Sequence, residues 1–315
     1  MKHSRLNTLN RKQKRKRKTR IERFLDLLPL IVLFTILGFL IFQVTQQMTV
    51  KQASTYSSST QIKETTATTA TTTSNTSSST AISWEVQSEP VKLPILMYHA
   101  IHVMAPEEEA NANLIVDPAT FESHLKALND AGYYTLSPEE AYKVLTGNIL
   151  PAGKKVVWLT FDDSLWDFYS HAYPLLKQYQ MKATNNVITG FTEYEQAGHL
   201  TIEQIKEMQA AGLSFQGHTV NHPDLEYSSF ETQITELTSS KAYLDSQLNQ
   251  ETIAIAYPGG RYSADTVALT EQAGYKLGVT TNNGLASASD GLLTLNRVRI
   301  LPTTTAENLL AEIAY

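Results

Sequence analysis

The feature that most restricts the fold is an alternation of short apolar runs with amphipathic segments between residues 91 and 300. The runs are rich in β-branched and aromatic residues, which predicts strands, and apolar spacings of three and four predict helices between them. We expect strands at 93–99, 133–136, 156–161, 183–189, 213–216, 253–257, 275–280 and 292–300. Strands that alternate with helices build a parallel sheet, and seven or eight such units close or nearly close into a barrel.

One expected strand ends in two adjacent carboxylates. The run from Val156 to Phe161 carries no charge, which is typical of a strand buried on both faces, and Asp162 and Asp163 follow it directly. Side chains alternate along a strand, so the two carboxylates could have separate tasks, one binding a metal and the other accepting a proton. For this pair taken alone, capping of the next helix remains an alternative.

Other polar residues fall at or just after expected strand ends, namely His99, His218, His222 and Pro258-Gly259. The carboxyl ends of the strands carry the chemistry in parallel α/β folds. We therefore expect these residues to share one site with the two aspartates.

His218 and His222 lie four residues apart. On a helical turn this spacing would place both imidazoles on one face, within reach of one cation. Adding a carboxylate gives an Asp/His/His set that leaves coordination positions for water and substrate. We expect a divalent metal, most simply zinc, with cobalt, manganese and nickel as alternatives. The other carboxylate would be the general base that deprotonates the attacking water.

The N-terminal part has a different composition. Residues 1–23 carry eleven lysines and arginines against one glutamate, and residues 27–44 are uncharged and almost wholly apolar. Eighteen helical residues span about 27 Å, close to the bilayer hydrocarbon thickness, and the basic flank predicts a cytoplasmic N-terminus. We expect a basic cytoplasmic segment at 1–26 and a single transmembrane anchor at 27–44. A cleaved signal peptide is the alternative; either way, the rest of the chain is exported.

The exported part divides in two. Ser and Thr dominate the stretch after the apolar segment, which predicts a disordered linker over 45–90 and a folded domain over 91–315. Residues 81–315 hold 13 lysines and arginines against 28 aspartates and glutamates, a formal charge of −15. So acidic a body argues against nucleic acid as a partner. The chain has no cysteine, so a metal site must use histidine and carboxylate ligands.

Two motifs carry a family resemblance. Thr160-Phe161-Asp162-Asp163, followed by His218-Thr219-Val220-Asn221-His222-Pro223, resembles the first two motifs of the polysaccharide deacetylases. These form carbohydrate esterase family four, the NodB homology domain. The resemblance extends from about residue 94 to residue 300, and the start Leu96-Met97-Tyr98-His99 is similar to the poly-N-acetylglucosamine deacetylase branch. It implies a distorted (β/α) barrel of about seven repeats that hydrolyses the N-acetyl group of an amino sugar and releases acetate.

The resemblance also implies roles for single residues. Asp162 would be the catalytic base, and Asp163, His218 and His222 the metal ligands. The family's late Leu-x-x-His motif, often the source of the acid, is absent, because no histidine follows His222. We assign His99 as the candidate acid instead.

In the third motif, Ala256 stands where the family usually has an arginine that orients the base. Arg297 is the candidate substitute, because an arginine inside a strand usually needs a buried partner; a surface salt bridge is the alternative. Gly259 could offer its backbone N–H to the oxyanion. Tyr257 and Trp166 are the remaining candidates for contacts with substrate.

Two departures from the family pattern leave the ligand set intact. Ser164 stands where glycine is usual after the aspartates, and Asn185-Asn186 stand where the family often has two phenylalanines. Either change could alter substrate access or mark a weakly active member.

We therefore expect a membrane-anchored, extracellular, metal-dependent polysaccharide N-deacetylase, presumed to be a monomer. Its substrate would be an N-acetylglucosamine-containing polymer of the cell wall or surface, either peptidoglycan or poly-N-acetylglucosamine. An O-deacetylase of an acetylated polysaccharide and a catalytically weak polysaccharide-binding barrel are the alternatives.

Overall fold

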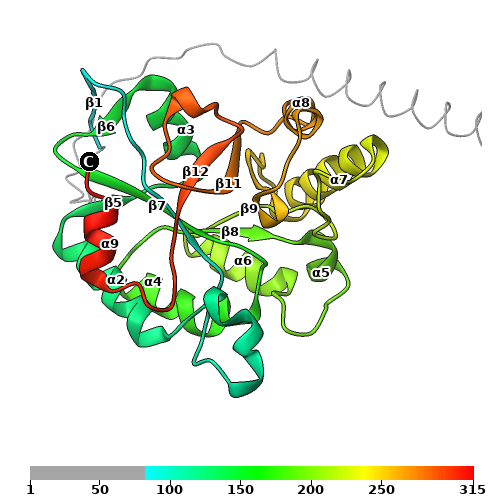
Figure 1. The fold of residues 1–315 in the computed structure, drawn as a ribbon, viewed down its shortest axis with the longest axis horizontal. Coiled ribbons are helices and arrows are strands. Elements are labelled where there is room, and N and C mark those ends of the chain that lie inside the picture. The colour runs from blue at the N-terminus through cyan, green and yellow to red at the C-terminus, as the bar shows by residue number, and fades with distance from the viewer. Residues whose placement is uncertain (1–81) are drawn as a thin grey trace, which may run out of the picture. The chain divides into compact units, whose positions relative to one another are not determined.

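The computed structural model of the chain describes residues 82–315 (Figure 1). The expected cytoplasmic segment, the membrane anchor at 27–44 and most of the expected linker lie outside the described residues. Within 82–315, no helix combines the length and the apolar character needed to cross a membrane. The fold begins before the predicted boundary at residue 91, because strand β1 (Trp84–Val86) pairs antiparallel with β6 (Ile149–Pro151).

Seven parallel strands close into a barrel, which confirms the predicted α/β barrel fold (Figure 1). Its strands, in chain order, are β2 (Ile95–Tyr98), β7 (Lys155–Phe161), β8 (Thr184–Val187), β9 (Ser214–Gly217), β10 (Ala254–Ala256), β11 (Leu277–Asn283) and β12 (Leu295–Arg299). The ring closes because β2 pairs with both β12 and β7. β5 (Tyr133–Thr135) adds to the first half of β7. The barrel is irregular, since the register between β11 and β12 shifts between Val279 and Asn283.

Helices surround the barrel (Figure 1). They are α2 (Pro118–Asp130), α3 (Pro138–Gly147), α4 (Tyr173–Gln178), α5 (Thr189–Glu193), α6 (Ile202–Ala210), α7 (Phe230–Leu248), α8 (Ala264–Gln272) and α9 (Ala306–Glu312). A π-helical turn, η2 (Phe168–Ala172), directly precedes α4, so the segment after β7 is not one regular α-helix. Pro174 lies in the first turn of α4 and has no N–H to donate, which is consistent with the altered hydrogen bonding before it.

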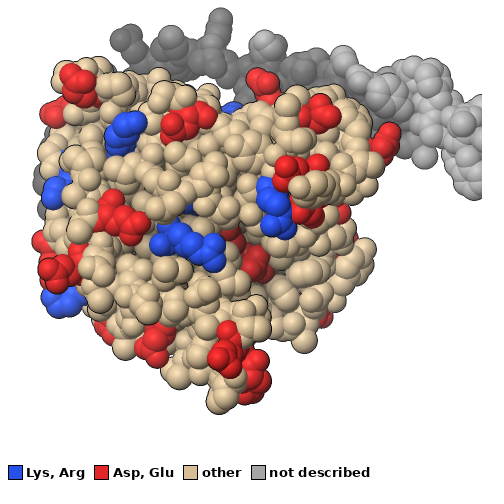
Figure 2. Space-filling view, in the orientation of Figure 1, with Lys and Arg blue, Asp and Glu red and all other residues tan. Residues whose placement is uncertain are grey.

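An insertion between β2 and α2 was not predicted. The short strands β3 (Ala100–Ile101) and β4 (Ile115–Val116) pair in parallel and flank a 3-10 helix, η1 (Pro106–Leu114). Two further 3-10 turns, η3 (Pro258–Gly260) and η4 (Ala288–Asp290), follow β10 and β11. Acidic side chains are spread over the face drawn in Figure 2 and outnumber basic ones there, as the composition predicts.

The core follows the alternation of side chains along the strands. On β7, Val157, Leu159 and Phe161 belong to a cluster that includes apolar residues of α2, α4, α6 and α9. Val156 and Trp158 belong to a second cluster, with Ile95, Val279 and Leu295 of other barrel strands among its members. Trp158 is 1% exposed, and its indole N–H donates to Thr184 Oγ1 at 2.8 Å. Burial on both faces explains why β7 is so consistently apolar.

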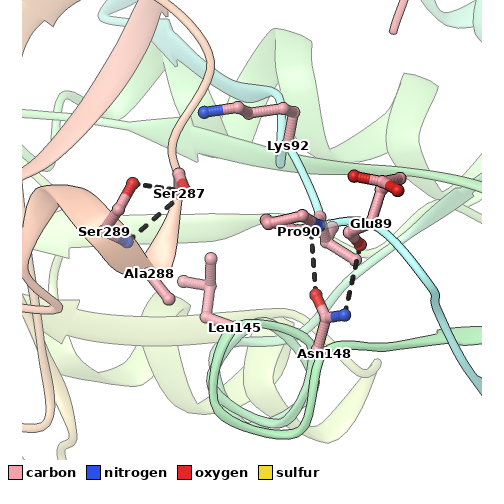
Figure 3. A pocket seen from close by; sticks show the side chains of 9 residues that line it. Glu89, Pro90, Lys92, Leu145, Asn148, Ser287, Ala288 and Ser289 are labelled. Carbon is pink, nitrogen blue, oxygen red and sulfur yellow. Dashed lines mark hydrogen bonds between the residues drawn. The ribbon is translucent and has the colours of Figure 1, made fainter.

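The segment that leads into β2 is held by Asn148, the C-cap of α3. The Asn148 side chain accepts from the Val91 backbone N–H at 2.9 Å and donates to the Glu89 carbonyl at 3.1 Å. Figure 3 shows the pocket of about 520 Å³ that this segment forms with Leu145 and the turn at Ser287–Ser289. It lies at the amino end of β2, whereas the predicted site residues follow carboxyl ends of strands.

Candidate active site

The structure brings the three predicted metal ligands together. Asp163 follows β7, His218 follows β9, and His222 lies in the same loop as His218. The Nε2 atoms of His218 and His222 lie 3.3 and 3.5 Å from Asp163 Oδ1. One ligand atom from each residue lies within 4.8 Å of the other two. One cation could therefore contact all three.

The chemistry of this cluster fits a divalent metal. His218 Nδ1 donates to the Ala256 carbonyl oxygen at 2.7 Å, which directs Nε2 toward Asp163 as the ligand atom. Burial alone would lower the pKa of His218, but the Asp163 hydrogen bond and the charges of Asp162 and Asp163 outweigh it and raise that pKa. The cluster thus attracts positive charge, and one carboxylate with two imidazoles is a ligand set for an open metal site.

The prediction that the two histidines share a helical turn is wrong. Residues 218–222 form a loop in which Thr219 (φ 65°) and His222 (φ 57°) are left-handed. The Thr219 hydroxyl accepts from the His222 backbone N–H at 3.0 Å. The two rings meet edge to face with their centroids 4.7 Å apart. A tight loop, rather than a helix, brings both imidazoles to Asp163.

Asp162 lies beside this cluster and contacts Arg297. Arg297 is fully buried, and its Nη1 and Nη2 donate to Asp162 Oδ1 and Oδ2 at 2.9 and 2.7 Å. The Arg297 Nε donates to the Thr280 carbonyl at 2.7 Å, which fixes the guanidinium plane. The alternative of a surface salt bridge for Arg297 is thereby excluded.

Burial by itself would raise the pKa of the Asp162 carboxyl. The charge and hydrogen bonds of Arg297, helped by His218 and His99, outweigh burial and hold that pKa well below its usual range. Asp162 is therefore ionised at neutral pH, as a general base must be. A carboxylate held this firmly is a weak base, so its proton donor must itself be acidified.

Asn186 is a contact of Asp162 that the sequence analysis missed. Its side-chain N–H donates to Asp162 Oδ1 at 2.8 Å. Asn186 belongs to β8, and its 1% exposure means that its amide needs a partner inside the protein. An amide near the end of a buried strand was the available signal, but nothing in the local sequence indicates which group it would contact.

A pocket of about 500 Å³ adjoins these residues, and His99, Asp163 and Trp166 are among those that line it. His99 Nε2 lies 4.0 Å from Asp162 Oδ2. Burial lowers the pKa of His99, although the charges of Asp162 and Asp163 oppose this shift. Trp166 also lines this pocket and is 48% exposed.

Gly259 and Tyr257, the two candidates that follow β10, differ in how accessible they are. Gly259 is exposed and left-handed (φ 59°) in the turn η3, so its backbone is accessible there. Tyr257 was predicted to contact substrate, and this prediction is wrong for its side chain. Tyr257 is fully buried in a cluster with Leu237 and Leu269 of α7 and α8, its hydroxyl donates to the Leu293 carbonyl, and burial raises its pKa to about 12.

Comparison with known proteins agrees with this geometry. The polysaccharide deacetylase family matches residues 150–278. YxkH of Bacillus subtilis (strain 168), which is assigned to the polysaccharide deacetylases, is 42% identical over 220 residues, which cover 70% of this chain and 75% of YxkH. The poly-beta-1,6-N-acetyl-D-glucosamine N-deacetylase of Staphylococcus aureus is 34% identical over 180 residues, 53% of this chain and 61% of that enzyme.

Among solved structures, the Streptococcus pyogenes deacetylase PplD in complex with acetate superimposes with a TM-score of 0.70 at 62% identity. The match covers 72% of this chain and 100% of the PplD chain. The barrel, the Asp/His/His cluster and these likenesses lead to one conclusion: the chain belongs to the polysaccharide deacetylase family, hydrolases that remove acetyl groups from polysaccharides.

Proposed function

We propose that this deacetylase is a metal-dependent N-deacetylase of an N-acetylglucosamine-containing polymer of the cell wall or surface. The observation that supports it most is that the Asp163/His218/His222 cluster lies beside Asp162 and next to the 500 Å³ pocket. A divalent ion held by the three ligands, most simply zinc, would polarise the acetyl carbonyl and acidify the attacking water.

The protein's own residues would divide the proton transfers. Asp162 takes the proton from the attacking water, and Arg297 keeps its carboxylate ionised and oriented. His99, 4.0 Å from Asp162 and on the wall of the same pocket, would accept this proton from Asp162 and pass it to the leaving nitrogen. The backbone N–H of Gly259 stabilises the oxyanion, and the Trp166 ring stacks on a sugar.

The choice of an N-acetyl substrate is supported by the 34% identity to the staphylococcal poly-beta-1,6-N-acetyl-D-glucosamine N-deacetylase. We also propose that residues 27–44 anchor the chain in the cell membrane, with the N-terminus in the cytoplasm and the catalytic domain outside, as a monomer. The basic flank and the length of the apolar segment support this placement. A polymer at the outer face of the membrane would then be within reach.

The test uses the full-length chain, purified in detergent, stripped of metal and reloaded with zinc or cobalt. Acetate release is measured on β-1,6-linked N-acetylglucosamine oligomers, on peptidoglycan and on acetylated xylan. We expect metal-dependent release from an N-acetylated polymer, lost in both Asp162→Asn and His218→Ala. Release from xylan alone would replace the proposal with O-deacetylation, and release that survives both substitutions would refute this site.

A further inference from the structure

The loop that carries His222 rests on a buried carboxylate outside the ligand set. Glu236, on α7, is 6% exposed. The backbone N–H groups of Val220 and Asn221 each donate to Glu236 Oε2 at 2.8 Å. The Asn221 side-chain amide donates to Glu236 Oε1 at 2.7 Å. One side chain thus binds three donors of the segment between the two histidine ligands.

That segment needs an external support because its backbone is strained at both sides. Thr219 and His222 are left-handed, and both are residues with a Cβ, for which this region is unfavourable. Val220 and Asn221, the two residues between them, are the ones held by Glu236. Three hydrogen bonds to one buried side chain therefore hold this turn in place.

The other face of the loop packs against the start of α5. The Thr189 and Gly190 backbone N–H groups donate to the Thr219 and Val220 carbonyls at 3.1 and 2.9 Å. A Cβ built on Gly190 would lie 2.7 Å from the Val220 carbonyl oxygen, so the two segments are in close contact. Backbone carbonyls are thus fixed by α5, and backbone N–H groups by Glu236.

The two histidine ligands depend on this support to different degrees. The His218 side chain is 2% exposed and donates to the Ala256 carbonyl at the end of β10. The His222 side chain is 36% exposed, and its backbone N–H is held by Thr219 of the loop. The position of His222 therefore follows the conformation of residues 219–221.

We propose that Glu236 is a positioning residue of the metal site, which holds the 219–222 loop so that His222 meets Asp163 and His218. The inference rests on the proposed function only in requiring that this cluster bind a divalent metal. Removing the carboxylate lets the loop relax and withdraws one ligand, so the site binds metal more weakly.

The test compares Glu236→Ala and Glu236→Gln with the parent, all as full-length chains in detergent. The matched control is Glu231→Gln, which changes an exposed glutamate of the same helix. Zinc affinity is measured by competition with a chromophoric chelator, and coordination by the visible spectrum of bound cobalt. Amide hydrogen exchange at Val220 and Asn221 is measured without metal.

We expect Glu236→Ala to weaken zinc binding about 10- to 100-fold, the usual effect of removing a support behind a ligand, and to alter the cobalt spectrum. Exchange at Val220 and Asn221 should accelerate in the same variant. Glu236→Gln keeps an acceptor for the two backbone donors and should recover part of both losses. Glu231→Gln should match the parent.

Zinc affinity and exchange rates unchanged in Glu236→Ala would overturn the inference. If Glu236→Ala does not fold, the test rests on Glu236→Gln. Weaker zinc binding together with faster exchange at Val220 and Asn221 in that variant supports the inference, and unchanged values of both overturn it. A parent chain that binds no metal would refute the proposed function instead, and the inference would fall with it. The exchange data would still show whether Glu236 holds the loop.

Discussion

Arg297 and Asp162 meet across the inside of the barrel, although β2 separates their strands, β12 and β7, in the ring. The pair is made of two hydrogen bonds of 2.9 and 2.7 Å between fully or almost fully buried groups. A guanidinium from the last barrel strand thus pairs with Asp162, the partner that the resemblance led us to expect for Arg297 in place of an arginine at the position of Ala256.

Replacing Arg297 by Met should leave the Asp162 carboxylate buried and unpaired. We expect a loss of about 3–5 kcal/mol in the free energy of unfolding, the usual cost of breaking a buried pair. Acetate release should fall by about 100-fold or more, because the base is misplaced. Urea unfolding and the acetate assay measure the two effects. The double variant Asp162→Asn/Arg297→Met should regain stability and stay inactive; an equally unstable double variant would contradict this explanation.

Metal should stabilise the folded protein through the Asp163/His218/His222 cluster. At a free zinc concentration about 1,000 times Kd, ligand linkage predicts a gain of about 4 kcal/mol. Thermal unfolding with and without zinc measures this gain, and a chelator should reverse it. His218→Ala should remove the gain, whereas His171→Ala, which changes a histidine of η2 outside the cluster, should keep it. A gain that persists in His218→Ala would place the metal elsewhere.

Trp166→Ala should affect the substrate more than the fold. The ring is 48% exposed at the pocket wall, so its loss removes little packing. We expect KM for the polymer to rise about three- to tenfold, equivalent to an aromatic contact of about 0.5–1.5 kcal/mol, with the melting temperature unchanged. Phe230→Ala, which removes an aromatic side chain that is 56% exposed and does not line this pocket, is the control. An unchanged KM would remove Trp166 from the binding site.

Acid should destabilise the protein through His124 of α2. Its Nε2 donates to the Thr304 carbonyl at 2.8 Å and its Nδ1 faces the Tyr98 hydroxyl at 3.1 Å, an arrangement that suits the neutral ring. Burial lowers the pKa of His124 below its ordinary 6.5. Below about pH 6.5 the unfolded chain therefore binds a proton that the folded protein does not, and the free energy of unfolding decreases.

The measurement is urea unfolding of the parent and of His124→Gln from about pH 8 to pH 5. We expect the stability advantage of the parent to shrink as the pH falls. The same advantage at every pH would show that His124 does not titrate in this range. Asp162 does not contribute to this slope, because its pKa is depressed and the stability of its ion pair is lost only at much lower pH.

Gly260→Ala should disrupt the turn that carries Gly259. A Cβ at Gly260 would lie 2.0 Å from Thr281 Oγ1 and 2.5 Å from the Thr281 backbone nitrogen. Gly132 has nearly the same φ, 74° against 71°, with nothing within 4 Å of its Cβ position, so Gly132→Ala carries the backbone strain alone. We expect Gly260→Ala to be less stable than Gly132→Ala by about 1–3 kcal/mol and to lose activity. Equal stabilities would show that Thr281 can move aside.

The strands and the ligand set could be predicted because their signals are local. An apolar run of six residues predicts a buried strand, and polar residues that follow such runs must meet where parallel strands end. The contact between Arg297 and Asp162 spans 135 residues, and the sequence offered only a reason why Arg297 needs a buried partner. Which carboxylate it would meet depends on how the barrel closes.

Other features were beyond local signals. Tyr257 follows Ala256 directly, and only the position of α7 and α8 decides that its ring faces away from the site. The spacing of four between His218 and His222 suggested a helical turn, whereas the structure has a loop with left-handed residues at Thr219 and His222. The role of Asn186 depends on the position of Asp162, which directly follows the neighbouring strand β7.

Asp162, the proposed base, and Asp163, the first proposed metal ligand, are consecutive residues. Asp163 (φ 74°) and Ser164 (φ 49°) leave the strand conformation, and both carboxylates belong to one site. A single peptide bond therefore links the carboxylate proposed to take the proton to the carboxylate proposed to bind the metal. Loops elsewhere around the barrel rim can change in length and sequence without altering this covalent connection.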